Sequence, residues 1–216
     1  GPGGLLIVDA ADPANPFALG SLATPGDALG VDHQAGLVAV ADGHAGVHLI
    51  DVADPANPAL VSTFDTDGLA TDVLFNGGVL YVADRLNGVL TLDISSPLLP
   101  ILVSQLGTQG SAYQLAIADD ITLLVAGYEG GVVTADIATP DSPAFLDEFG
   151  TPGTARSIAW DHATGDVVLA DLYAGVHRID GAQTMFAGIG STRPTAGAAV
   201  GIAAADGLAY VADNQG

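Results

Sequence analysis

Short apolar runs alternate with turn residues along the whole chain. Between residues 27 and 64, the segments 27–33, 36–42, 46–51 and 58–64 carry small, apolar or β-branched residues, and Gly, Asp, Asn and Pro separate them. Segments bounded in this way predict β-strands. No stretch shows the 3.6-residue apolar period of a helix, so the pattern predicts an all-β protein.

The same four-strand unit returns about every 42 residues. The phrase GLLIVDAADPANP at Gly4 returns as GVHLIDVADPANP at Gly46, GVLTLDISSPLLP at Gly88, GVVTADIATPDSP at Gly131, and in eroded form as GVHRIDGAQTMFA at Gly175. A period near 40 residues built from strands is typical of a propeller, whose blades contain four antiparallel strands each. We therefore predict a single five-bladed β-propeller domain over residues 4–216.

The two ends of the chain supply complementary halves of a blade. Segments 199–204 and 207–213 match the inner two strands of the unit, and segments 4–9 and 16–22 match the outer two. We expect these four strands to form one blade, because closure hides sheet edges that would otherwise pair with other chains. A piece of a larger propeller is the alternative. Residues 1–3 resemble a scar left by protease cleavage.

The charge balance narrows the choice of partners. The chain has 25 acidic and 4 basic residues, for a net charge of −21, and it has neither Lys nor Cys. A polyanionic surface repels nucleic acid and anionic membranes, and no apolar run approaches the roughly 18 residues of a membrane span. We expect no nucleic-acid binding and no membrane insertion. The absence of Cys excludes disulfides and thiolate metal sites.

The phrases LLIVDAADPANP, VHLIDVADPANP and VLYVADRLNGVLTLDISSP resemble the LVIVD-repeat β-propellers of bacterial and archaeal surface or secreted proteins. The resemblance covers residues 4–216 and is weakest in the fifth repeat, where Gln183-Thr184 replaces Asp-Pro. It implies an extracellular or cell-surface setting, with the chain as a monomeric domain of a larger protein. It implies no general activity, and the signature residues have the character of scaffold.

Several repeated residues have a structural explanation. The Asp after each third strand is typical of tight-turn chemistry, in which the carboxylate accepts backbone N–H bonds. A repeated Ala, as at Ala70, begins the strand expected nearest to the axis, where we predict that it relieves crowding. His48 and His177 share one repeat position, which favours strand packing or exposure over metal binding, and Trp160 favours packing over binding.

Binding residues are expected where the repeats disagree. The loops between the second and third strands and the first residues of the inner strands differ from blade to blade, and both sets should lie at one end of the disc. This predicted ligand face comprises His44, Asp72, Arg85, Tyr113, Gln114, Tyr128, Glu129, Arg156, Tyr173, Asn214 and Gln215. Aromatic rings and amides suit a glycan or an extended peptide, and the two arginines suit a carboxylate.

Carboxylates on the inner strands and in nearby loops suggest two other kinds of site. Asp27 and Asp72 are candidates for the paired acids of a glycosidase-like hydrolase. Asp65, Asp67 and Asp72 are weak calcium candidates, but the twelve-residue loop with its closing Glu is missing. No nucleophile motif, phosphate loop or zinc motif is present.

The sequence thus predicts a non-catalytic, adhesin-like binding module of a surface or secreted protein, with no required cofactor and a glycan, peptide or protein as its partner. A glycosidase-like hydrolase is the first alternative. A ligand-free spacer or an engineered repeat scaffold is the second.

Overall fold

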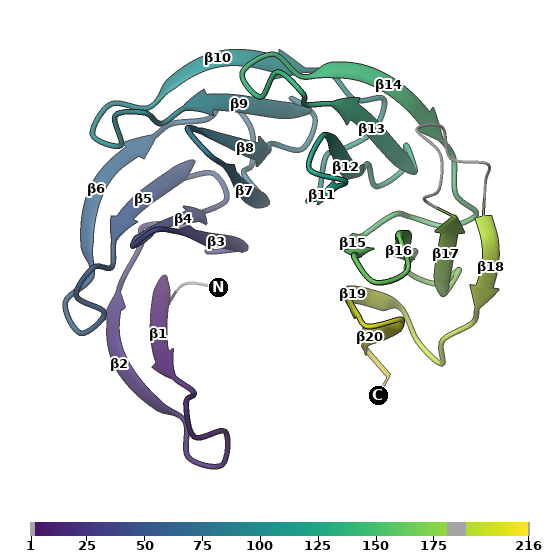
Figure 1. The fold of residues 1–216 in the computed structure, drawn as a ribbon, viewed down its shortest axis with the longest axis horizontal. Coiled ribbons are helices and arrows are strands. Elements are labelled where there is room, and N and C mark those ends of the chain that lie inside the picture. The colour runs from purple at the N-terminus through teal and green to yellow at the C-terminus, as the bar shows by residue number, and fades with distance from the viewer. Residues whose placement is uncertain (1–2, 181–188, 216) are drawn as a thin grey trace.

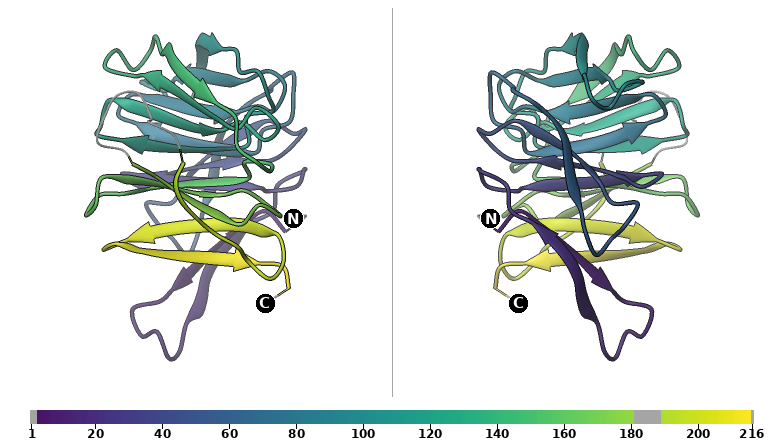
Figure 2. Two further views of the ribbon diagram at one scale, coloured as in Figure 1. Left: turned by 90° about the vertical axis from the view of Figure 1, so that its right-hand side faces the viewer. Right: turned by 90° about the vertical axis from the view of Figure 1, so that its left-hand side faces the viewer.

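The structure, a computed structural model, describes residues 3–180 and 189–215. Its regular elements in this part are β-strands, arranged as an arc of sheets around a central axis (Figure 1). The side views show these sheets stacked face to face (Figure 2). The fifth-repeat residues Gln183 and Thr184 lie outside the described residues.

Four complete blades occupy the middle of the arc, and each is an antiparallel sheet with its strands in sequence order. Blade 1 contains β3 (Gly30–Gln34), β4 (Leu37–Ala41), β5 (Val47–Asp51) and β6 (Ala59–Phe64). Blade 2 contains β7 (Asp72–Asn76), β8 (Val79–Ala83), β9 (Val89–Asp93) and β10 (Ile101–Leu106). Blade 3 contains β11 (Gln114–Ala118), β12 (Thr122–Ala126), β13 (Val132–Asp136) and β14 (Ala144–Phe149). Blade 4 contains β15 (Ser157–Asp161), β16 (Asp166–Ala170), β17 (Val176–Asp180) and β18 (Ile189–Arg193).

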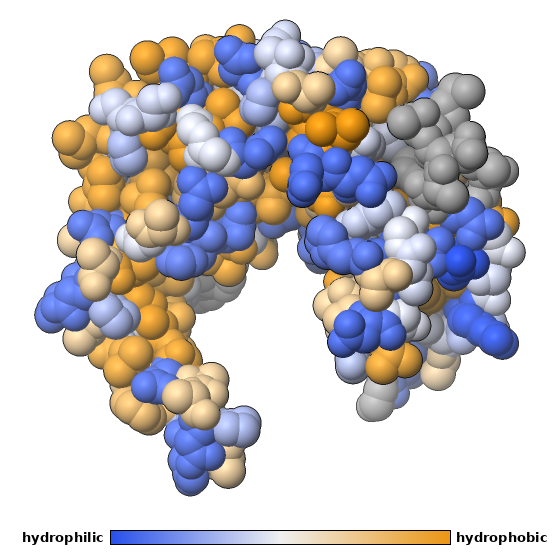
Figure 3. Space-filling view, in the orientation of Figure 1, coloured by the Kyte–Doolittle hydropathy of each residue, from blue (hydrophilic) through white to orange (hydrophobic). Residues whose placement is uncertain are grey.

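The two ends of the chain form separate two-stranded sheets. The N-terminal hairpin pairs β1 (Leu5–Asp9) with β2 (Phe17–Leu22), and the C-terminal hairpin pairs β19 (Ala199–Ala205) with β20 (Leu208–Asp213). The hairpins lie on opposite sides of a gap in the arc (Figure 1), and the space-filling view shows a hollow at its centre (Figure 3). The all-β, propeller-like architecture is confirmed, whereas the sheets are not closed into a ring in this structure.

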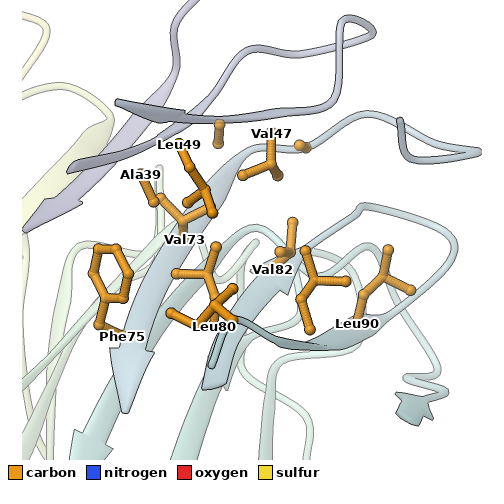
Figure 4. Packing of buried hydrophobic residues seen from close by; sticks show 12 residues of the cluster. Ala39, Val47, Leu49, Val73, Phe75, Leu80, Val82 and Leu90 are labelled. Carbon is orange, nitrogen blue, oxygen red and sulfur yellow. The ribbon is translucent and has the colours of Figure 1, made fainter. Parts of the chain in front are cut away.

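Apolar residues between successive blades form the core. On the face between blades 1 and 2, Ala39 and Leu49 pack against Val73, Leu80 and their neighbours (Figure 4). Equivalent clusters join blade 2 to blade 3 and blade 3 to blade 4, and smaller clusters join each hairpin to its neighbouring blade. The second strand of each complete blade is buried on both faces, which explains its continuous apolar sequence.

The repeated alanines lie between neighbouring blades, so the crowding that they relieve is that of one blade against the next. Ala70, Ala112, Ala155 and Ala199 are fully buried. They form isolated antiparallel bridges with the preceding blade at Gly43, Arg85, Tyr128 and Leu172 respectively. In the first three bridges, two backbone N–H···O=C bonds of 3.0 to 3.2 Å connect the blades. A small side chain lets the two backbones approach each other at this point.

Repeated carboxylates stabilise the turns, as the sequence predicted. Asp9, Asp51, Asp93 and Asp136 each accept a bond from the backbone N–H two residues later, at 2.8 Å. A second set, at the end of the second strand, connects strands within a blade: Asp42, Asp171 and Asp213 accept bonds from the N–H groups of Gly26, Gly153 and Gly197 respectively. These aspartates therefore belong to the scaffold.

Sequence reasoning missed a buried Thr–His–Asp chain in blades 1 and 4. In blade 1, His48 Nδ1 lies 2.9 Å from the hydroxyl of Thr63, and His48 Nε2 lies 3.0 Å from Asp42 Oδ2. In blade 4, His177 makes the same contacts with Thr192 and Asp171 at 2.8 and 2.9 Å. The recurrence of His and Thr at matched repeat positions is the signal that could have revealed the chain. Both histidines are buried, in agreement with the predicted packing role.

Candidate functional site: an aromatic–arginine cluster

The loops between the second and third strands of the blades have a left-handed residue at their second position. This position is Gly43 in blade 1, but Arg85, Tyr128 and Leu172 occupy it in the next three blades, with φ of 51°, 50° and 40°. A non-glycine residue in this conformation is strained, and such strain concentrates at functional sites. The interblade bridge fixes the backbone here, so each loop presents its side chain from a rigid base.

Four predicted residues from three blades come together at this end of the disc. The rings of Tyr113 and Tyr128 are stacked, with centroids 5.6 Å apart and planes inclined by 22°. The guanidinium carbon of Arg156 lies 3.6 Å from the centroid of the Tyr113 ring, and that of Arg85 lies 4.6 Å from it. These distances are those of cation–π contacts, which orient both guanidinium groups. We call these four residues the aromatic–arginine cluster.

The charge of the cluster is not neutralised within the described part of the chain. No carboxylate in residues 3–180 or 189–215 forms an ion pair with Arg85 or Arg156, whereas Arg178 pairs with Asp166 and Asp180 at 2.7 and 2.9 Å. Burial lowers the pKa of the Arg156 guanidinium from its ordinary value, and the nearby Arg85 charge lowers it further. Arg85 Nε is buried without a hydrogen-bond partner. Two uncompensated cations in a chain of net charge −21 favour an anionic ligand.

Two hollows flank the Tyr113 ring. The first, which we call the Tyr113 pocket, has a volume of about 240 Å³ and is lined by Leu29, Thr71, Asp72, Tyr113, Gln114, Arg156, Ser157, Val200 and Gly201. The second, the Leu29 pocket, has a volume of about 530 Å³ and is lined by Pro25, Gly26, Asp27, Leu29, Gly43, His44, Ala45, Leu69, Arg85 and Tyr113. Each hollow thus has one of the two arginines in its wall.

Asp72 and Gln114 join neighbouring blades through their side chains. Asp72 Oδ2 accepts a bond from the N–H of Leu115 at 2.9 Å, and Gln114 Oε1 accepts one from Ile158 at 3.0 Å. Ser157 occupies the same repeat position, and its hydroxyl accepts the N–H of Ile202 at 2.9 Å. Ser157 was not among the predicted residues, although its repeat position already contained two of them. These polar side chains bind the inner strands together and border the Tyr113 pocket.

Burial raises the pKa of Asp72 to about 7. The backbone N–H bonds that Asp72 accepts lower its pKa, while the charge of Asp32 raises it further. Asp32 itself accepts the N–H of Phe75 at 2.7 Å. Asp72 therefore combines a blade-to-blade role with a protonation change near neutral pH, beside a cationic cluster.

The other predicted residues lie outside the cluster. His44 is exposed, with its Nδ1 3.0 Å from the backbone oxygen of Gly68, and it lines the Leu29 pocket beside Arg85. Glu129 and Tyr173 are exposed, and 85% of the Tyr173 surface is open to solvent. Asn214 Oδ1 accepts the N–H of Ala198 at 2.9 Å, which gives it a turn-stabilising role. Gln215 is exposed at the end of the described chain.

The carboxylates considered for other chemistry are dispersed. Among residues 3–180 and 189–215, no group of three or more His, Asp or Glu side chains is placed to hold a metal ion, so Asp65, Asp67 and Asp72 do not form a cation site here. Asp27 is exposed in the Leu29 pocket, and Asp72 borders the Tyr113 pocket. In the same described part, no helix is long and apolar enough to cross a bilayer.

Comparison with protein families identifies the repeat. The family model of the LVIVD repeat matches residues 1–24, 25–66 and 67–108, which together make up half of the chain. The chain belongs to the LVIVD repeat family. The resemblance seen in the repeated phrases is thereby confirmed for this LVIVD-repeat chain. A search of curated proteins finds no match.

Solved structures with the same architecture have little sequence identity to this LVIVD-repeat chain. The computationally designed Ika8 protein matches with a TM-score of 0.71 at 12% identity, over 93% of this chain and 60% of its own. The designed Ika4 protein matches with a TM-score of 0.59 at 13% identity, over 72% of this chain and 91% of its own. The β-propeller domain of Cps50 (Swd1) from Myceliophteria thermophila matches with a TM-score of 0.67 at 10% identity, over 90% of this chain and 70% of its own. The chain therefore spans about 60% of the length of Ika8. These similarities support the β-propeller fold.

Proposed function

We propose that the chain is a non-catalytic binding module that takes a carboxylate-bearing ligand, such as an acidic sugar or a peptide carboxyl terminus, at the aromatic–arginine cluster. The observation that carries the proposal is the pair Arg85 and Arg156, which share the Tyr113 ring and have no carboxylate partner in the described part of the chain. A guanidinium group binds a carboxylate through two parallel hydrogen bonds. The stacked tyrosines supply a rigid apolar surface beside that contact.

The proposal is tested by titration calorimetry with two pairs of probes. Glucuronate is compared with glucose, and a short peptide with a free carboxyl terminus is compared with its amide. We expect binding only of the charged member, and Arg156→Gln should weaken it at least about tenfold, the effect of removing a hydrogen bond to a charged group. Arg178→Gln is the matched control, because Arg178 already pairs with two carboxylates. Binding that persists unchanged in Arg156→Gln would refute the assignment.

We also propose that the binding scaffold is a closed five-bladed ring, completed by the two end hairpins. The repeat aligns β20 with β4 and β1 with β5, so Val211 should pair with Leu6, as Val40 pairs with His48. Val40 and His48 are buried in blade 1, whereas Val211 and Leu6 are 37% and 59% exposed. Pairing of β20 with β1 would cover apolar surface that the hairpins leave open to solvent.

The exposed inner strand of blade 1 also supports the proposed closed ring. Val73, Leu115 and Ile158 share one repeat position, and each is buried against the blade that precedes it. Val31 has the same position in blade 1 but is 60% exposed, and Tyr210, the counterpart of Ala39, is equally exposed. The proposed closing blade would place its apolar face against Val31.

A further inference from the structure

A third hollow continues along the axis from the Tyr113 pocket. We call it the axial cavity; its volume is about 770 Å³ and Gln114 lines both hollows. Its wall comes from the inner strands β7, β11, β15 and β19, with Leu74, Ala116, Ile117, Ala159, Trp160 and Ala203 among the lining residues. Its volume is within the range of sites that bind small molecules.

The inner strands arrange their side chains along the axis in layers. The first layer is polar and contains Asp72, Gln114 and Ser157, beside Tyr113 and Arg156. Two residues further along the strands, the second layer contains Leu74, Ala116, Ala159 and Ala203, and Asp32 has the same repeat position on β3, where it accepts the N–H of Phe75. Alternate residues of a strand share one face, so this order follows from the strand period of two. A cationic entrance therefore leads to an apolar wall.

The small residues of the second layer determine what shape fits there. Alanine on three of the four strands lets an unbranched chain lie close to the backbone, and Leu74, Ile117 and Trp160 provide apolar surface around it. From Asp72 to Asn76 the strand advances roughly 13 Å, at about 3.3 Å per residue. The polar residues Asn76, Asp120 and His162 line the cavity as well. The apolar wall thus has room for a chain of medium length.

We infer that the ligand of this module is an aliphatic carboxylate, with its carboxylate at Arg156 of the aromatic–arginine cluster and its unbranched hydrocarbon chain in the axial cavity. The inference rests on the proposed function, because it takes the anion site as given and assigns the chemistry of the attached group. An aliphatic carboxylate fits this site because the positive charge of the entrance matches its carboxylate and the apolar wall behind the entrance matches its hydrocarbon chain. A sugar acid would leave its hydroxyl groups against that wall without partners.

The experiment measures binding of butanoate, hexanoate and octanoate by titration calorimetry. We expect each added methylene to strengthen binding up to about fourfold, the value for a fully buried methylene. The variant Ala116→Leu/Ala159→Leu fills the apolar layer and should abolish this dependence on chain length while it preserves binding of butanoate. Arg156→Gln should weaken all three ligands by the same factor. Ala144→Leu, on the exposed outer strand β14, is the control for an added leucine.

A second measurement does not require the cavity-filling variant to fold. Trp160 is the only tryptophan of the chain and lines the axial cavity, so quenching of its fluorescence reports a ligand against the wall of that hollow. An octanoate brominated at its terminal carbon should quench Trp160 at saturation, and bromoacetate should not.

The outcomes separate the two proposals. Arg156-dependent binding of butanoate with no gain from a longer chain, or with no quenching of Trp160, overturns the aliphatic ligand and leaves the anion site standing. If Ala116→Leu/Ala159→Leu shows the same chain-length dependence as the wild type, the longer ligands adsorb nonspecifically, and this result also overturns the aliphatic ligand. If glucuronate and the free-carboxyl peptide also fail to bind, the proposed function fails as well.

Discussion

Arg85 and Tyr128 hold a backbone conformation that blade 1 assigns to glycine. At φ near 50° both residues are strained, yet their backbones still form the bridge to the next blade that Gly43 forms without strain. Leu172 occupies the same position in blade 4 and makes no ring contact in the described structure. The same scaffold position thus carries either glycine or a side chain of the proposed binding cluster, and the strain is the cost of placing a side chain there.

Arg85→Gly should therefore separate stability from binding. We expect its free energy of unfolding to stay within about 1 kcal/mol of the wild type, because relief of the left-handed strain offsets the added flexibility of the unfolded chain. Carboxylate binding should fall at least about tenfold. Leu172→Gly relieves the same strain and should leave binding unchanged. Urea denaturation and titration calorimetry measure the two effects, and loss of both stability and binding in Arg85→Gly would show that the side chain is structural.

Asp72 predicts a dependence of stability on pH. Its pKa of about 7 in the folded protein lies above the unfolded value of 3.8, so the folded state binds the proton more tightly. The resulting stabilisation is complete below about pH 4, falls between pH 4 and pH 7 and is absent above that window. Asp72→Asn can still accept the N–H of Leu115 but cannot ionise. We expect it to be more stable than the wild type by about 1–3 kcal/mol at pH 8, with little advantage at pH 4. Equal differences at both pH values would contradict the raised pKa.

At the scale of the single element, each blade carries the same strand order with different internal hydrogen bonds. Blade 1 and blade 4 contain the Thr–His–Asp chain, and in blade 2 Leu90 occupies the position of His48. Asp84 is fully buried in blade 2, and its Oδ1 has no hydrogen-bond partner in the structure. In blade 1 the matching oxygen, Asp42 Oδ1, accepts the Thr24 hydroxyl at 2.7 Å, so blade 2 lacks this contact as well as the imidazole. The blades share their strand pairing but differ in how well their polar groups are satisfied.

His48→Leu should destabilise blade 1 by recreating the arrangement of blade 2. It removes the imidazole from Asp42 Oδ2, which keeps only the N–H of Gly26, and it removes the partner of the Thr63 hydroxyl, so the free energy of unfolding should fall by about 1–3 kcal/mol. His44→Leu is the control, because His44 is exposed. The measurement is urea denaturation of both variants. An equal effect of the two substitutions would show that the buried chain contributes no specific stability.

In the whole molecule, the two end hairpins and the blade next to them leave apolar side chains uncovered. The arc leaves Leu6, Val31, Tyr210 and Val211 more than one third exposed, although their counterparts in complete blades are buried. The arc also superposes on 60% of the longer Ika8 chain. Closure within one chain, which we propose, requires the hairpins to approach across the gap shown in Figure 1.

A pair of engineered cysteines tests that closure, and the natural chain has no cysteine to interfere. Leu6→Cys/Val211→Cys joins positions expected to face each other, and oxidation should give a cross-linked monomer, detected by mass spectrometry and non-reducing electrophoresis. Leu6→Cys/Tyr210→Cys is one residue out of register and should not cross-link, because neighbouring residues point to opposite faces. A cross-linked dimer, or no cross-link in either variant, would contradict closure within one chain.

Much of the architecture was readable from local patterns. Apolar alternation and Gly, Asp and Pro turns located the strands: the expected segment 36–42 corresponds to β4, and 46–51 corresponds to β5. Such features depend on neighbouring residues and on a repeated unit, so they can be found from the sequence alone. The disagreement between repeats also pointed to Arg85, Tyr113, Tyr128 and Arg156, because variable loops at one end of a repeat scaffold share one face.

Contacts between blades could be identified only in the tertiary structure. The sequence placed the repeated alanines at the axis, but their side chains pack where one blade bridges the next, and nothing in a linear pattern distinguishes those two surroundings. Tyr113, Tyr128 and the two arginines also come into contact only because three blades, separated by many residues, turn by a particular angle around the axis. The same angle shapes the axial cavity. The sequence of each repeat determines how the strands pair within a sheet. Side-chain packing between sheets determines how far each blade is rotated from the next, and the candidate site depends on that rotation.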